Sequence, residues 1–187
     1  MNRRQFLQRG IQLGAIAPVL GLAPLLGHAP YPQWSVYRQR HLIILTSKAD
    51  RGSFPLGKAI AETLATYLPD SEARVSRAPD WQRVASLITT EQMELAVMPR
   101  WAAVALAEGR SPFQRFEAAN LRSLYDLGDH VLVCRANFDA DHARWVADTL
   151  KHHADDFTDL MVHTEPMTET RSLPIHPGAI AALQSNA

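Results

Sequence analysis

The chain has 187 residues, a length that accommodates one domain together with a targeting segment. Hydrophobic residues make up 47 %, which is enough for a sizeable core and excludes a wholly disordered chain. Lys and Arg total 19 and Asp and Glu total 19, so the chain lacks the net positive charge typical of nucleic-acid-binding proteins. The single cysteine, Cys134, excludes an internal disulfide and any Cys-rich metal framework.

Residues 1–29 have the pattern of an export signal. A twin-arginine pair, Arg3-Arg4, is followed by Phe6-Leu7 and then by an apolar run over residues 11–26. A charged head before a modest apolar stretch is typical of exported proteins, and the run of about 16 residues is shorter than the ~20 of a membrane-spanning helix. The sequence therefore predicts export to the periplasm by the twin-arginine pathway. A general secretory signal or a short anchor is the alternative.

The three small-x-small motifs that could be cleaved are each followed by proline, at Pro18, Pro24 and Pro30. Proline is a poor residue after a scissile bond because its ring fixes φ and it has no N–H. The signal could therefore remain as a membrane anchor. Residues 30–40, rich in proline and aromatic residues, are interpreted as a linker.

From residue 41 onward, apolar strands alternate with helices. We expect a strand at 41–46, a helix from Ser53 to Tyr67, a short strand at 73–75 and a helix beginning at Trp81 with Asp80 as its N-cap. A strand at 95–98 and a helix at 102–108 follow. Next come strands at 121–125 and 130–135, a helix at 139–155, and a tail in which Pro177-Gly178 is expected to shape a turn. This order predicts a single α/β lobe over residues 41–187, with a mostly parallel sheet flanked by helices.

Four segments of this lobe resemble the TAXI class of TRAP-transporter solute-binding proteins, in the same order along the chain. They are GSFPLG at 52–57, VASLITTEQMELAV at 84–97, LRSLYDLGDHVLVCRANF at 121–138 and LPIHPGAI at 173–180. The resemblance implies the periplasmic-binding-protein fold and no cofactor. It also implies a receptor-like function in TRAP-type uptake or sensing of small carboxylates such as glutamate or 2-oxoglutarate, with TRAP membrane subunits as partners.

Two departures from the family weaken the expected ligand site. The mature chain is about half as long as a family member, so that the second lobe is missing and the clamshell that encloses a ligand has only one wall. The family's Thr-Gly-Gly-Ser turn is replaced by residues 77–81, where proline removes an N–H and the Asp80 carboxylate repels an anion. We therefore expect weak or degenerate binding. The alternative is a protein–protein interaction module that binds a periplasmic or membrane partner.

Ligands of such sheets gather at the carboxyl ends of the strands, against helix N-termini. An N–H group at the start of a helix can hold a carboxylate, and a guanidinium can pair with one. The structural alternatives are that Ser53 is an ordinary N-cap, that the charged loop residues are only solvated, and that the tryptophans pack into the core. The candidate ligand-binding residues are Ser53, Phe54, Lys48, Arg51, Trp81, Arg100 and Trp101.

The face bounded by Phe54, Trp81, Arg100 and Trp101 is also a candidate interface with a second copy or another protein, since aromatic residues and arginine dominate such contacts. The alternative is that these aromatic residues pack into their own lobe.

No pattern of catalytic residues stands out, and no enzyme activity is expected. Cys134 lies in an apolar strand and is interpreted as a small buried hydrophobic residue. The His and Asp residues between His152 and His163 are metal-ligand types, but adjacent residues on a helix do not face each other. This run is interpreted as a solvated helix end, and no metal is expected.

Overall fold

A computed structural model of the chain describes residues 41–161 and 172–184. The predicted signal or anchor at 1–29 and the linker at 30–40 lie outside the described residues. The described residues belong to one compact unit, Val36–Ala187. The predicted α/β class and single small lobe are confirmed.

Five strands form one sheet with the order β2-β1-β3-β5-β4. The strands are β1 (Ile43–Ser47), β2 (Arg74–Ala78), β3 (Leu95–Pro99), β4 (Leu121–Leu127) and β5 (His130–Arg135). Strand β1 pairs in parallel with β2 and β3, whereas β5 pairs antiparallel with both β3 and β4. The sheet is therefore mixed, and the expectation of a mostly parallel sheet was not accurate.

The antiparallel pairing follows from a two-residue turn. Leu127 pairs with His130, so only Gly128 and Asp129 connect β4 to β5. Gly128 has a φ of 76°, a backbone conformation that glycine adopts without strain and that tight hairpins need at this position. Two parallel strands would instead require a crossover connection of a dozen or more residues. The turn thus sends β5 back between β3 and β4.

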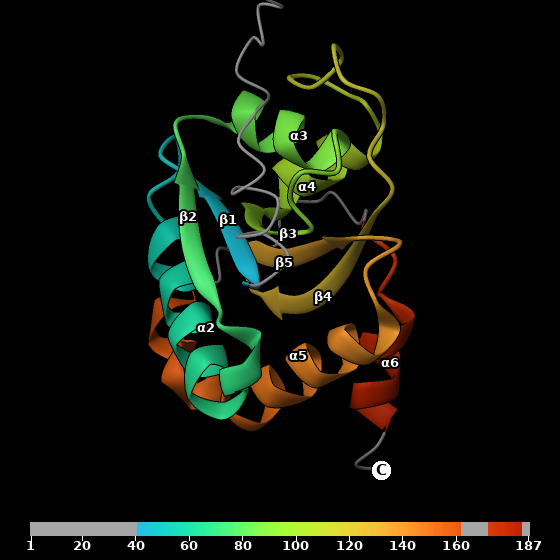
Figure 1. Cartoon of the computed structure of the whole chain (residues 1–187). Helices are drawn as coiled ribbons and strands as arrows, with labels where there is room; N and C mark the ends of the chain where they lie inside the picture. Colours follow the sequence, from blue (N-terminus) through green and yellow to red (C-terminus); the bar gives the residue numbers. More distant parts are fainter. Residues whose placement is uncertain (1–40, 162–171, 185–187) are drawn as a thin grey trace, which may run out of the picture. The chain divides into compact units, whose positions relative to one another are not determined.

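Helices cover both faces of the sheet (Figure 1). The helices α2 (Ser53–Tyr67), α5 (Ala140–His152) and α6 (Pro177–Gln184) contribute to one hydrophobic cluster, and α3 (Trp81–Thr89) and α4 (Arg100–Ala107) contribute to the other. Short 3-10 helices lie at Pro69–Ser71, Ala154–Asp156 and Thr158–Leu160. The expected helix at 139–155 therefore ends at His152 and continues as 3-10 turns.

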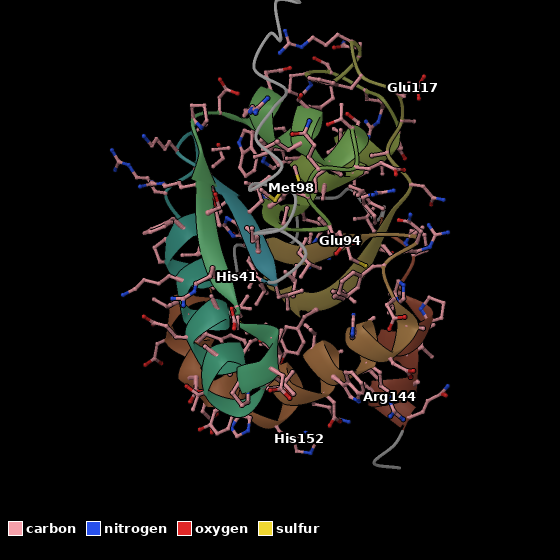
Figure 2. All side chains as sticks on the ribbon, viewed as in Figure 1. His41, Glu94, Met98, Glu117, Arg144 and His152 are labelled. Carbon is pink, nitrogen blue, oxygen red and sulfur yellow. The ribbon has the colours of Figure 1, made fainter. Side chains whose placement is uncertain are left out.

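Strand β3 shows how the two clusters share the sheet. All five of its residues are buried, and successive side chains point to opposite faces. Leu95 and Val97 join the cluster with α2 and α5, whereas Ala96 and Met98 join the cluster with α3 and α4. Met98 accordingly lies among the side chains between the sheet and these two helices (Figure 2).

The C-terminal segment covers the β4 edge of the sheet. Ile175 forms a parallel bridge with Ser123, whose N–H donates to the carbonyl of Pro174 at 2.9 Å and whose carbonyl accepts from the N–H of His176 at 2.9 Å. The chain then enters α6 at Pro177, so the turn expected at this position is wrong. Proline is favoured in the first helical turn, where its missing N–H costs nothing.

Candidate functional site

The carboxyl ends of β1, β2 and β3 lie at one edge of the sheet, which also holds the β4–β5 hairpin. From the neighbouring strands β1 and β3, the chain continues into α2 and α4, which pack on opposite faces. Such a switch point creates the crevice where open α/β sheets bind ligands. The loops after β1, β2 and β3 therefore lie at this edge, and the N–H of Lys48 in the first of them donates to the carbonyl of Ala78 at 2.8 Å.

A carboxylate of the chain itself lies at this edge of the sheet, at the start of α2. Oδ2 of Asp50 lies 2.7 Å from the backbone nitrogen of Ser53 and 2.8 Å from Nε2 of His130. Oδ1 of Asp50 accepts a longer bond, 3.4 Å, from the N–H of Gly52. Two N–H groups at the start of α2 and one imidazole nitrogen therefore surround this carboxylate.

These contacts lower the pKa of Asp50 from 3.8 to about 2. Burial is the largest single influence and acts in the opposite direction, because removing water disfavours the charged form. The hydrogen bond and electrostatic attraction between Asp50 and His130, together with the N–H groups of Ser53 and Gly52, outweigh it. Asp50 is consequently ionised at every pH near neutrality, and its negative charge lies where an anionic ligand would be expected.

His130 is the first residue of β5 and comes from the hairpin. It is 9 % exposed, and its Nδ1 has no hydrogen-bond partner among the described residues. The ring packs directly against Gly52, where an added Cβ would lie 2.7 Å from Cε1 of His130. Glycine at position 52 thus lets the imidazole approach the backbone at the start of α2 and reach Asp50.

Sequence reasoning missed both Asp50 and His130. Asp50 precedes the first residue of α2 by three positions, an offset at which an acidic side chain can accept from a helix N–H. His130 follows a Gly-Asp turn at the loop edge of the sheet, which is also a local signal. Neither signal reveals that the two residues meet, because they are 80 positions apart.

The predicted residues of the first loop have different environments. Ser53 is fully buried, and its Oγ lies 3.4 Å from both the nitrogen and the oxygen of Ser47. The N-cap of α2 is Gly52, so the alternative that Ser53 serves as the N-cap is wrong. Lys48 and Arg51 are exposed and form no ion pair with any residue of 41–161 or 172–184.

Phe54 is partly buried and lies beside the β2 edge. The guanidinium carbon of Arg77 lies 4.7 Å from the centroid of its ring, which is within range of a cation–π contact. The phenylalanine is thus in contact with a cation of its own chain.

Arg100 connects α4 to the hairpin. Its Nη2 donates to Oδ1 of Asp126 at 2.7 Å and to the carbonyl of Gly128 at 2.8 Å. Its backbone N–H donates to the carbonyl of Asp129 at 2.9 Å. A ligand carboxylate would therefore compete with Asp126 for the guanidinium.

The two tryptophans differ in exposure. Trp81 is 9 % exposed and belongs to the hydrophobic cluster of α3 and α4, so the expectation that it bounds an open face is wrong. Its position at the start of α3 turns it inward with Val84 and Ala85. Trp101 is 50 % exposed, which is more than Trp81 or Phe54, the other aromatic residues of the predicted face.

The described residues offer little other chemistry. Within 41–161 and 172–184, no three His, Cys, Asp or Glu side chains lie together as a metal site would require. Cys134 is fully buried, and burial raises the pKa of its thiol to about 12. None of the helices in this part of the chain has the length and apolar character needed to cross a bilayer.

Neither the family models nor the curated proteins supply a relative to place beside this geometry. No family model matches the chain, and no curated protein matches it. The likeness to the TAXI class accordingly stays a prediction, carried by the four segments quoted for it.

Proposed function

We propose that the chain is an exported, non-enzymatic, receptor-like protein of the TAXI kind, associated with TRAP-type uptake or sensing of small carboxylates and weak or degenerate in binding them. The observation that carries this proposal is the position of Asp50. Its carboxylate already accepts from the start of α2 and from His130, so an external carboxylate must displace it or bind elsewhere. An intramolecular competitor is present at high effective concentration. It therefore weakens the binding of a ligand that needs the same hydrogen-bond donors.

The single lobe supports weak binding independently. High-affinity pockets bury ~70–90 % of a small ligand, and one wall covers only part of that surface. Binding nevertheless carries the full cost of immobilising the ligand. The proposed setting is the periplasm, with TRAP membrane subunits or another periplasmic protein as partners, and residues 1–29 are proposed to supply export or anchoring.

Calorimetry with glutamate and 2-oxoglutarate tests this proposal on the chain without residues 1–29. We expect millimolar or undetectable binding by the native sequence and at least tenfold tighter binding by Asp50→Ala, because the substitution frees the N–H groups and His130. Asp139→Ala is the matched control, and we expect it to bind as the native sequence does. Asp139 also caps a helix, accepting from the N–H of His142 at 2.9 Å, but it follows the end of β5 opposite the candidate site.

Two results would contradict the proposal. Micromolar binding by the native sequence would show an ordinary receptor with an open site. No gain in Asp50→Ala, in a variant that still melts cooperatively, would show that Asp50 does not compete with a ligand.

Exposure of Trp101 favours a second candidate function, an interaction module. Trp101 is half exposed beside the partly exposed Arg100, and tryptophan and arginine are frequent interface anchors. The partner would be another periplasmic protein or a second copy of the chain. Light scattering on the native sequence and on Trp101→Ala separates these cases: a dimer lost in the variant supports self-association, and a monomer in both removes it.

A further inference from the structure

The two edges of the sheet differ in how they are covered. The β4 edge is paired with residues 174–176, as described above. The β2 edge has no strand or bridge beside it among residues 41–161 and 172–184. An uncovered edge strand presents unpaired backbone N–H and C=O groups, which can pair with another extended chain.

Hydrogen bonds show which backbone groups of β2 point toward β1 and which point away from the described part of the sheet. The N–H of Arg74 donates to Leu42, and the carbonyl of Ala78 accepts from Lys48, so both residues face β1. The carbonyl of Ser76 accepts from Oγ1 of Thr46, at 3.0 Å, and therefore also faces β1. Backbone groups alternate between the two sides of a strand, so the N–H and C=O groups of Val75 and Arg77 point away from the sheet.

The side chains of β2 make this edge positive. Arg74 and Arg77 are exposed, and neither forms an ion pair with a described residue. Lys48 and Arg51 follow the adjacent strand and are likewise exposed. Asp50, the carboxylate of the same loop, is turned inward toward His130 and does not neutralise them.

We propose that the β2 edge binds an extended acidic segment of a partner protein, which adds to the sheet as a sixth strand. Backbone pairing with Val75 and Arg77 would supply affinity, and acidic side chains opposite Arg74 and Arg77 would supply specificity. A second copy does not fit, because two β2 strands paired edge to edge would bring arginines together. The first 40 residues contain arginines and no acidic residue, so they do not complement this edge either.

The spacing of the arginines defines the acidic segment further. Residues three apart lie on opposite faces of a strand. Val75 packs partly buried against the α2 cluster, and Arg77, two positions on, lies over Phe54 on that same side. The partner segment therefore carries two acidic residues separated by two other residues. Of these two, the residue opposite Val75 is apolar.

A short peptide tests this proposal in the chain without residues 1–29. The probe is the acetylated and amidated peptide Thr-Glu-Val-Thr-Glu-Thr, and the readouts are calorimetry and amide hydrogen exchange. We expect binding that slows exchange at Val75 and Arg77. The double variant Arg74→Glu/Arg77→Glu should weaken binding at least tenfold and bind the version of the peptide with lysines in place of both glutamates.

The control variant Arg115→Glu/Arg144→Glu changes net charge by the same amount at exposed residues that form no described ion pair. Arg144 lies on the α5 layer, away from β2 (Figure 2). This control should bind the acidic peptide as the native sequence does. Equal weakening in the control would show a general charge effect and overturn the proposal.

Three further results would also overturn it. The first is peptide binding that does not slow hydrogen exchange at Val75 and Arg77, and the second is slow exchange of both amides in the free protein. The third is failure of the lysine peptide to bind the Arg74→Glu/Arg77→Glu variant. Protection in the free protein would mean that another part of this chain covers the edge. This test reads the protection of Val75 and Arg77 by a peptide, whereas the test of the carboxylate site reads calorimetry with glutamate and 2-oxoglutarate, so the two can fail separately.

Discussion

At the scale of single residues, Asp50 fastens the loop after β1 to the start of β5. Its carboxylate accepts from His130 and from the N–H of Ser53, and it is less than a quarter exposed. A charge-assisted hydrogen bond in such a partly dry position is stronger than one between neutral groups. The contact therefore contributes to stability as well as occupying the N–H groups at the start of α2.

The lowered pKa of Asp50 predicts how this contribution depends on pH. A carboxyl group with a pKa of 3.8 when unfolded and about 2 when folded stabilises the protein above pH 4 and loses that effect as pH falls toward 2. The full contribution is about 2 kcal/mol, and roughly half of it remains at pH 3. We expect Asp50→Asn to lower the free energy of unfolding by about 2 kcal/mol at pH 6 and by about half as much at pH 3.

Urea unfolding of the native sequence and the variant at both pH values measures this difference. Asp155→Asn is the control, since Asp155 is exposed and forms no hydrogen bond or ion pair with the described residues. A penalty for Asp50→Asn that is the same at pH 3 and pH 6 would refute the proposed ionic contribution.

At the scale of elements, local patterns predicted most helices and strands because their signals lie within a few residues. Helix α2 spans the predicted Ser53–Tyr67, and Asp80 caps α3 as expected by accepting from Arg83. Asp139 likewise caps α5, accepting from the N–H of His142 at 2.9 Å. Apolar periodicity and capping residues are sufficient for such assignments.

Helix α6 was missed because its first two residues are Pro177 and Gly178, which usually indicate a turn. The reason for Gly178 lies in another element. A Cβ at this position would lie 2.2 Å from the carbonyl oxygen of Ala140 and 2.8 Å from the Cβ of Ala143. Glycine allows α6 to approach the start of α5 closely, which no local pattern can reveal.

Gly178→Ala is therefore expected to destabilise the protein by about 3 kcal/mol, the upper part of the usual range for overpacking. Alanine favours helix by about 1 kcal/mol over glycine, but a contact with backbone of another helix outweighs that gain. Thermal and urea unfolding measure the effect. Ala181→Ser, at an exposed position of α6, should change stability by about 0.5 kcal/mol or less. A neutral or stabilising Gly178→Ala would show that the two helices separate easily.

At the scale of the whole molecule, the sequence predicted the α/β class and the edge of the sheet at which candidate residues gather. It did not predict which contacts these residues make. Arg100 is bound to the hairpin, Trp81 is in the core, and Asp50 occupies the start of α2. Each of these outcomes depends on a contact between residues distant in sequence. Patterns of spacing place a residue on an element, whereas its partner is determined by how the elements assemble.

The tight turn between β4 and β5 has a consequence for the order of folding. Closing this hairpin first joins Leu127 to His130, with only two residues between them. Pairing β1 with β3 joins Ile44 to Leu95, which closes a loop of 95 − 44 = 51 positions. Longer loops cost more entropy to close, so local pairs form first. In pulsed hydrogen exchange during refolding, we expect amides of β4 and β5 to gain protection before those of β1. The reverse order would mean that the parallel strands nucleate the fold and the hairpin docks last.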